Sequence, residues 1–254
     1  MQVAGFNVVD LLPFIGVGFA AQLVDGALGM AFGVISNTLM VGVLGVPPAL
    51  ASQRVHFVEC FTTAASGISH LLHRNIDGKL FLRLLVPGVI GGIAGAYVLT
   101  NIDAEVVKPF VLTYLTVIGI YLLVRGLLYP PKLREAKHVA PLGLVGGFLD
   151  AAGGGGWGPV VTSNLLVQGA EPRKVVGTVS AVEFFLTITV SAAFLYHLGF
   201  ADLAEPSVGL LIGGLAGAPI GAFAAKHFNP KYMLVLVGLV LTATSAYGVY
   251  RAWG

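Results

Sequence analysis

The sequence DAAGGGGWGP, residues 150–159, separates two apolar runs in the second half of the chain. A related sequence, DGALGMAFG at residues 25–33, separates two apolar runs in the first half and aligns Asp25 with Asp150. We call these stretches the first and the second glycine break. Glycine backbone is costly inside a membrane helix, because it loses conformational freedom and exposes N–H and C=O groups; it is tolerated only beside protein or a water-filled cavity. We therefore interpret the two breaks as the walls of one binding site.

The composition is that of an integral membrane protein. The 254 residues are 56% hydrophobic and 10% charged, whereas an ordinary soluble domain carries about 25% charged residues. Apolar runs recur from end to end, and no polar block is large enough to fold alone, so we expect one membrane domain over residues 1–254. The net charge of +2 is too small and too scattered for a nucleic-acid partner. The expected surroundings are a lipid bilayer.

Hydropathy predicts an all-α polytopic protein. Four apolar runs flank the glycine breaks, and each is shorter than the roughly 20 residues that a crossing helix needs. We therefore expect each break to be the tip of a broken or re-entrant helical hairpin. The short runs are residues 11–24, 31–46, 139–149 and 160–167. The full spans are expected at residues 49–72, 80–99, 106–129, 175–198, 207–225 and 232–253.

The chain also repeats its own order of segments. GGIAGA at residues 91–96 recurs as GGLAGA at residues 213–218, each in the second span of its half. The division is therefore repeat one at 8–129, a charged linker at 130–138 and repeat two at 139–253. A returning hairpin followed by three spans changes sides an odd number of times. Repeat two must then be inverted relative to repeat one, as in many transporters.

The distribution of charge predicts the orientation. If the loop at residues 70–83 is cytoplasmic, all Lys and Arg residues except Arg54, Lys108 and Arg251 lie on the cytoplasmic side. The positive-inside rule then places both termini outside the cytoplasm, in a multi-pass protein of the cell membrane.

Four acidic residues lie at membrane depth, namely Asp25, Glu59, Asp150 and Glu183. A charge at the centre of a membrane helix costs about 2.5 to 3.5 kcal/mol on insertion scales, so such residues are usually paired or functional. Asp25 and Asp150 precede the glycines, where a functional role and the capping of free N–H groups are both open. For Glu59 and Glu183, inside long spans, we favour a function such as proton coupling.

A polar stripe accompanies Glu59. Gln53, His56, Cys60 and Thr63 lie around it at helical spacing, and a milder stripe in the second half includes Thr178. Such stripes usually face a cavity; the alternative is hydrogen bonding between helices. Arg54 lies near the outer end of the stripe, where it could bind an anion or extend to the membrane interface.

The two breaks suit a small anion. A helix that starts after a glycine break directs free N–H groups and the positive end of its dipole into the gap, and short polar side chains follow each break. We expect neither catalytic residues nor a metal or cofactor, because no His and Cys cluster has metal-ligand spacing and no nucleotide-binding loop is present. The residues expected to bind substrate are Gly29, Ser36, Asn37, Gln53, Arg54, His56, Gly153, Gly154, Gly155, Gly156, Ser163, Asn164 and Thr178.

The length, the repeat, the second glycine break and the sequence VGTVSAVEF at residues 176–184 together resemble the TauE/SafE family of sulfite exporters, over nearly the whole chain. The resemblance implies a secondary transporter that exports a small sulfur-containing anion, such as sulfite, thiosulfate or an organosulfonate, across a bacterial-type inner membrane. The first half departs from the family pattern, because residues 26–33 are poorer in glycine and Gln53-Arg54-Val-His56 replaces small residues. Protons could be exchanged at Glu59, Glu183 or His56, although a passive anion uniporter would use the same residues.

Two other classes stay open. A membrane-embedded sulfur-relay or binding component would hand its substrate to a partner and would need Cys60 as its thiol carrier. A cation transporter is the weaker alternative, because the sequence has no surplus of carboxylates at membrane depth.

Overall fold

The computed structural model describes residues 2–3, 6–28, 31–128, 137–168, 170–200, 203–227 and 230–253. Within these residues the chain is helical, apart from a two-stranded antiparallel pairing of β1 (Gln2–Val3) with β2 (Phe6–Asn7). The helices are α1 (Val8–Leu28), α2 (Phe32–Thr38), α3 (Pro48–Leu72), α4 (Gly78–Asn101), α5 (Ala104–Leu127), α6 (Val139–Gly153), α7 (Ser163–Gln168), α8 (Pro172–Leu198), α9 (Ala204–His227) and α10 (Pro230–Trp253). Two π-helical segments, η1 (Leu39–Val43) and η2 (Trp157–Thr162), continue α2 and precede α7.

The six predicted spans correspond to long helices among the described residues. Helices α3, α4, α5, α8, α9 and α10 contain 24 to 27 residues, which is about 36 to 40 Å at 1.5 Å per residue and enough to cross a bilayer core of about 30 Å. By length and apolar content together, three described stretches qualify as membrane-crossing, Gly78–Asn101, Pro109–Leu127 and Lys174–Leu198. The prediction of an all-α protein with membrane-length helices is confirmed.

Local signals explain where the helices begin and end. Helix α3 begins at Pro48, and α8 begins at Pro172, positions where the missing N–H of proline costs nothing. Asp77 caps α4, because its Oδ1 accepts hydrogen bonds from the backbone N–H of Lys79 at 2.9 Å and of Leu80 at 3.1 Å. Gly199 ends α8 with a φ of +74°, a left-handed conformation that favours glycine.

The helix before each break differs in length between the halves. Helix α1 has 21 residues, longer than the predicted run at 11–24, because it continues through Asp10 and Gly26. An acidic residue in the first turn favours that extension. Helix α6 has 15 residues, close to the predicted run at 139–149. Of the predicted linker at 130–138, only residues 137 and 138 lie within the described part of the chain.

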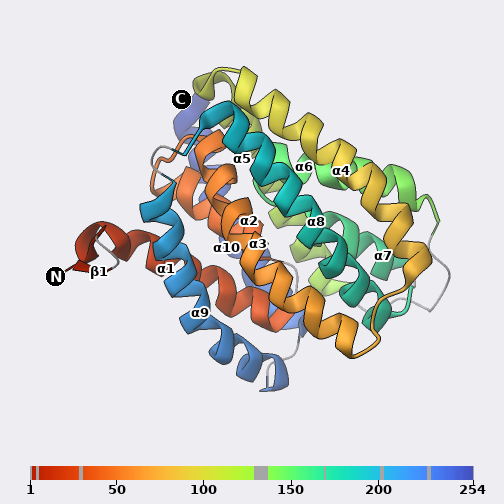
Figure 1. Ribbon diagram of the computed structural model, residues 1–254. Coiled ribbons are helices and arrows are strands. Elements are labelled where there is room, and N and C mark those ends of the chain that lie inside the picture. Colours follow the sequence, from red (N-terminus) through yellow and green to blue (C-terminus); the bar gives the residue numbers. More distant parts are fainter. Residues whose placement is uncertain are drawn as a thin grey trace.

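The long helices pack in pairs that join the two halves. Helix α1 packs along α9, α6 along α4, α3 along α8 and α5 along α10 (Figure 1). The repeated small-residue motifs make two of these contacts. Gly91 of α4 lies against the backbone of Leu144 on α6, and Gly213 of α9 lies against the backbone of Ile15 on α1; in neither place is there room for a Cβ atom. Close approach of this kind is the usual reason for small residues between membrane helices.

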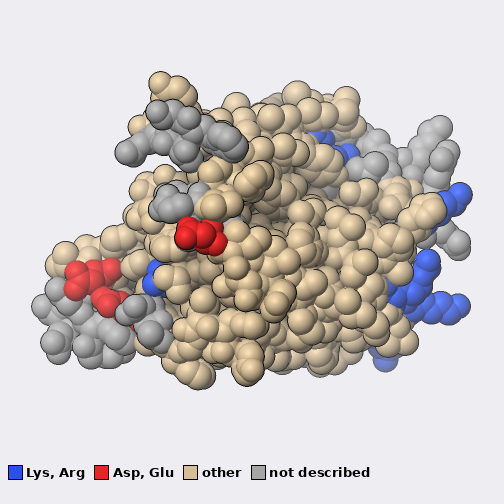
Figure 2. Space-filling model, turned by 90° about the horizontal axis from the view of Figure 1, so that it is seen from above, with Lys and Arg blue, Asp and Glu red and all other residues tan. Residues whose placement is uncertain are grey.

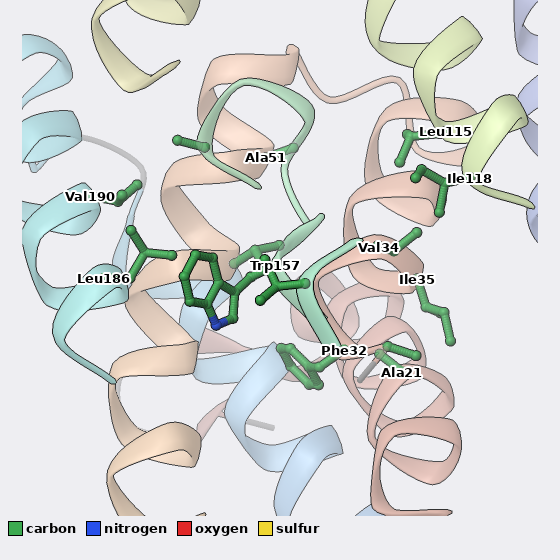
Figure 3. Packing of buried hydrophobic residues seen from close by; sticks show 14 of the residues in the cluster. Ala21, Phe32, Val34, Ile35, Ala51, Leu115, Ile118, Trp157, Leu186 and Val190 are labelled. Atoms are coloured by element: carbon green, nitrogen blue, oxygen red, sulfur yellow. The ribbon is translucent and has the colours of Figure 1, made fainter. Parts of the chain in front are cut away.

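The buried core lies where the two breaks pass between the long helices. Trp157, at the start of η2, is fully buried beside Leu186 and Val190 of α8, and Phe32, at the start of α2, lies nearby (Figure 3). The indole Nε1 of Trp157 donates a hydrogen bond to the carbonyl oxygen of Val179 at 3.2 Å. This bond satisfies a polar group that would be expensive to bury alone.

The segment from α6 through η2 to α7 begins and ends at the same place. The backbone N–H of Lys137, before α6, donates to Oε1 of Gln168, the last residue of α7, at 2.6 Å. The start of α6 and the end of α7 therefore lie side by side, with the second glycine break between them in sequence.

Candidate functional site

The two glycine breaks touch each other in the middle of the molecule. Gly155 lies against the backbone of Gly33 and Val34, so closely that a Cβ atom at Gly155 would overlap them, and its φ is +139°. Gly154 has a φ of +70° and lies against the amide of Asn37 in the same way. Both requirements, positive φ and close approach, are met by glycine alone. The crossing of the two breaks therefore explains Gly154 and Gly155, while Gly153 and Gly156 lie against the ring and hydroxyl of Tyr114.

A hydrogen bond also connects the breaks across 116 positions of sequence. Nδ2 of Asn37, on α2, donates to the carbonyl oxygen of Gly153 at 2.7 Å. On the opposite side of the second break, the Tyr114 hydroxyl of α5 lies 3.5 Å from the carbonyl oxygen of Gly155. Two helices of the first half thus contact the second break.

Each break is capped by its own aspartate with the same spacing. Oδ1 of Asp25 accepts hydrogen bonds from the N–H groups of Ala31 at 2.7 Å and Phe32 at 3.2 Å. Oδ1 of Asp150 accepts from Gly156 at 2.8 Å and Trp157 at 2.9 Å. The capping role considered for both aspartates is therefore present. Some of the N–H groups expected to face an anion are occupied by carboxylates of the protein itself.

A cavity of about 260 Å³ lies beside this crossing. Helix α3 contributes a stripe of residues spaced by three or four positions, which lie on one face and run from the middle of the helix to its last turn. The stripe consists of Glu59, Thr62, Thr63, Ser66 and His70. Helix α8 contributes Val176, Ser180 and Glu183, and α1 contributes Gln22 and Asp25. The backbone of both breaks completes the wall.

The four intramembrane carboxylates all line this cavity. Glu59 is 5% exposed and Asp150 is 3% exposed, so both reach it from buried positions. Of the described residues that line the cavity, none is Lys or Arg, and His70 is the one that can carry a positive charge. Within the described part of the chain, no group of three or more His, Cys, Asp or Glu residues could hold a metal ion.

Asp150 forms a buried pair with His56 of α3. Nε2 of His56 lies 3.0 Å from Oδ2 of Asp150, and Nδ1 lies 2.8 Å from the carbonyl oxygen of Ser52. Because a carbonyl oxygen can only accept, Nδ1 carries a proton, and a second proton must lie between Nε2 and Oδ2. The pair is therefore either imidazolium with carboxylate or imidazole with carboxylic acid. Together with the bond from Oγ of Ser52 to the carbonyl oxygen of Ala151 at 2.8 Å, it holds α3 against the second break.

Several residues expected at the binding site lie away from the cavity. Nε2 of Gln53 donates to the carbonyl oxygen of Gly199 at 2.8 Å. The Arg54 guanidinium is 7% exposed and lies 5.8 Å from the centre of the Phe14 ring. Oγ1 of Thr178 accepts from the backbone N–H of Asp77 at 2.8 Å. These three side chains connect helices.

The other expected residues divide into three groups. Gly155 and Gly156 line the cavity. Ser36, Asn37, His56, Gly153 and Gly154 are buried beside it without lining it, and Asn164 is half-buried on α7. Gly29 and the side chain of Ser163 lie outside the described residues.

Gln22, Thr62, Ser66 and His70 line the cavity but were not expected there from the sequence, whereas Ser180 belongs to the milder stripe of the second half that includes Thr178. A signal for them existed. Thr62, Ser66 and His70 continue from Glu59 at helical spacing toward the end of α3, and Gln22 lies one turn before Asp25. Cys60 points elsewhere, because its Sγ lies 3.2 Å from the His56 carbonyl oxygen and 3.4 Å from Oγ of Ser191.

The cavity extends toward the cationic end of the molecule. On the face shown in Figure 2, most Lys and Arg residues lie toward one end and the Asp and Glu residues toward the other. The loop between α3 and α4 lies toward this end (Figure 1). Arg74 of the loop and Lys79 and Arg83 of the first turns of α4 are exposed. His70, in the last turn of α3, is the lining residue nearest to this loop in sequence.

Comparisons with known proteins agree with these features. The family profile described as "Sulfite exporter TauE/SafE" matches residues 14–248. The chain is similar to a protein of Bacillus subtilis (strain 168) named "Probable membrane transporter protein YtnM", with 43% identity over 253 residues that cover 96% of this chain and 84% of the relative. No solved structure matches.

Proposed function

The chain belongs to the TauE/SafE family of sulfite exporters and is a multi-pass membrane transporter, and from that premise we propose that it exports a small sulfur-containing anion such as sulfite, thiosulfate or an organosulfonate. The observation that carries the proposal is the cavity at the crossing of the two glycine breaks. Its volume of about 260 Å³ suits a small oxyanion. Backbone of both breaks, including first-turn positions Gly33, Val34 and Gly158, lines it beside short hydroxyl side chains.

We also infer an inverted-topology repeat, in which each half is one re-entrant hairpin followed by three membrane helices. The packing pairs support it. When each helix is replaced by its counterpart in the other half, the α1 and α9 pair becomes the α6 and α4 pair. The α3 and α8 pair and the α5 and α10 pair stay unchanged. Such exchange is the property of two repeats related by a two-fold axis, and the odd number of spans expected in each half favours an axis in the membrane plane. The identical spacing of the two aspartate caps is further support.

The orientation follows from charge. With the cationic end in the cytoplasm, both termini lie outside it and the cavity extends toward the cytoplasm. An exporter loads its substrate from that side. The proposed location is the inner membrane of a bacterial-type cell.

We propose that protons bind together with the anion and neutralise carboxylates that line the cavity. An oxyanion beside Glu59 and Glu183 is repelled when both carboxylates are ionised, so the anion binds best together with protons. Binding free energies are reciprocal, and protons then also bind best together with the anion. Proton and anion would move together, in the direction set by their combined gradients.

The decisive experiment is transport by the purified protein in liposomes. We would load sulfite, thiosulfate, sulfate and short sulfonates one at a time and measure their release. Release of at least one sulfur anion should exceed that from protein-free liposomes about tenfold, and protein carrying Gly155→Ala should match the protein-free control. If no anion of the panel is released, the proposal is wrong.

One observation favours a second candidate, cation transport: four carboxylates and no described Lys or Arg line the cavity. The same liposomes decide between the two. If the liposomes show flux of Na⁺ or K⁺ that depends on Glu59 and Glu183, and no anion flux, the transported substrate is a cation.

A further inference from the structure

We propose that His70 recognises the anion at the entrance of the cavity, donating the Nε2–H of a tautomer that Asn75 fixes. This inference rests on the proposed anion transport and adds a residue that selects for anions. Among the described residues that line the cavity, His70 is the one able to carry positive charge, and the other ionisable groups are the carboxylates of Asp25, Glu59, Asp150 and Glu183.

The hydrogen bond to Asn75 determines which nitrogen of His70 carries the proton. Nδ2 of Asn75 lies 3.1 Å from Nδ1 of His70. An amide nitrogen only donates, so Nδ1 accepts, and the proton of the neutral ring is on Nε2. Nε2 is therefore the donor that His70 retains for a ligand, which suits an oxyanion and not a cation.

The loop that carries Asn75 is held in place by the first turns of α8. The backbone of Asn75 lies against Gly177, where a Cβ atom would overlap it. The Lys174 ammonium donates to the carbonyl oxygen of Arg74 at 2.8 Å, and the N–H of Asp77 donates to Oγ1 of Thr178 at 2.8 Å. Three contacts thus fix the loop, and the loop orients His70. Gly177 and Thr178 belong to the family-like sequence at 176–184, for which this arrangement supplies a role.

His70 is far enough from Glu59 to bind an anion before that carboxylate is neutralised. It follows Glu59 by eleven positions along α3, about 16 Å at 1.5 Å per residue. At that distance, repulsion across water is largely screened at physiological salt. The exposed Arg74 and the half-buried Lys174 add positive potential on the same side. An anion would then bind first at His70 and afterwards move along Thr62, Thr63 and Ser66 toward the breaks.

The test compares His70→Ala with a matched control. His197 occupies the last turn of α8 as His70 occupies the last turn of α3, but it does not line the cavity. We would measure binding of radiolabelled sulfite and thiosulfate by the purified protein and the concentration dependence of their transport. His70→Ala should raise the Kd and KM about tenfold, the loss expected for one hydrogen bond to a charged group. Its maximal rate should stay within twofold of wild type, and His197→Ala should change neither value.

Two further variants keep the inference testable if His70→Ala does not fold. His70→Gln retains an N–H donor and should hold the KM within about threefold of wild type. Asn75→Leu removes the bond that fixes the tautomer, so nitrogen-15 NMR of His70 should change from one neutral tautomer to a mixture, and the KM should rise about twofold to threefold. If Asn75 does not fix the tautomer, the nitrogen-15 spectrum of His70 in Asn75→Leu will still show a single tautomer.

The outcomes are distinct. If wild type transports sulfur anions and His70→Ala transports them with an unchanged KM, the role of His70 is wrong and the proposed function stands. If wild type transports no anion of the panel, the proposed function fails, and the role of His70 fails with it.

Discussion

The two glycine breaks share their caps but differ in how they are held. Oδ1 of each aspartate accepts two N–H groups from its own break. Oδ2 of Asp150 is paired with His56 of α3, whereas Oδ2 of Asp25 has no hydrogen-bond partner within the described part of the chain. The offset that relates Glu59 to Glu183 also relates His56 to Ser180, and Ser180 lines the open cavity beside Asp25. Among the described residues, side-chain hydrogen bonds connect the second break to α3, and none connects the first break to α8.

The second break needs glycine at two positions. Gly154 and Gly155 have φ values of +70° and +139°, whereas Ala31 of the first break adopts a φ of −136°, which any residue can adopt. Ala31 aligns with Gly156. Gly29 and Met30, which align with Gly154 and Gly155, lie outside the described residues.

The largest effect is expected from Gly155→Ala. The new Cβ would overlap the backbone of Gly33 and Val34 at a φ of +139°, so the crossing of the breaks must shift. We expect release of the transported sulfur anion from liposomes to fall about tenfold, to the level of protein-free liposomes. Gly16→Ala is the control, because no atom lies within 4 Å of its added Cβ, and it should retain full activity. Normal transport by Gly155→Ala would mean that the crossing is not part of the transport site.

Removing the partner of Asp150 should have the next largest effect. His56→Ala leaves a buried carboxyl without its partner, which costs about 3 to 5 kcal/mol of folding free energy, and it should lower the Tm by several degrees. Ser180→Ala, at the equivalent position, should leave the Tm unchanged. The double variant His56→Ala with Asp150→Asn should recover part of the loss, because an amide needs no charged partner. Equal Tm values for the two alanine variants would contradict the difference between the breaks.

Much of the scaffold could be predicted from the sequence, because the long helices follow from hydropathy and proline alone. The sequence also predicted that Asp25 and Asp150 are equivalent positions, since each precedes a run with little side-chain volume. The bond between His56 and Asp150 was not readable, because it joins residues 94 positions apart. Helical spacing also tells which residues share a face of α3 but not which face meets the cavity. Gln53 was therefore expected at the site, and Ser66 and His70 were missed.

Glu59→Gln and Glu183→Gln should separate proton coupling from anion passage. Each amide keeps the shape of a protonated carboxyl without titrating. At least one variant should exchange anion for anion at a normal rate, yet lose about tenfold of the accumulation driven by a pH gradient. Glu59 is the stronger case, because its Oε1 lies beside the first break at Gly33. In wild type, acidifying the side that holds the anion should accelerate its uptake. Uptake that ignores the pH gradient at fixed membrane potential, with substrate protonation accounted for, would leave both residues structural.

The smallest effect is expected from Cys60→Ser. The thiol contacts the His56 carbonyl oxygen and Ser191 and does not line the cavity, and the equivalent position in the second half is Phe184. Transport by the serine variant should stay within twofold of wild type in the liposome assay. A complete loss would instead support a sulfur relay through this thiol.

The hydrogen bonds of the first break have a consequence for biosynthesis. The cap from Asp25 to Ala31 spans only six positions, so it can form as soon as this segment leaves the ribosome. The bond from Asn37 to Gly153 spans 116 positions and cannot form until the chain has been made through Gly153. When the first half enters the bilayer, the N–H groups at the start of α2 can already be bonded to Asp25, whereas the side-chain amide of Asn37 still lacks its hydrogen-bond acceptor. Formation of that bond therefore requires the second break to have packed against α2.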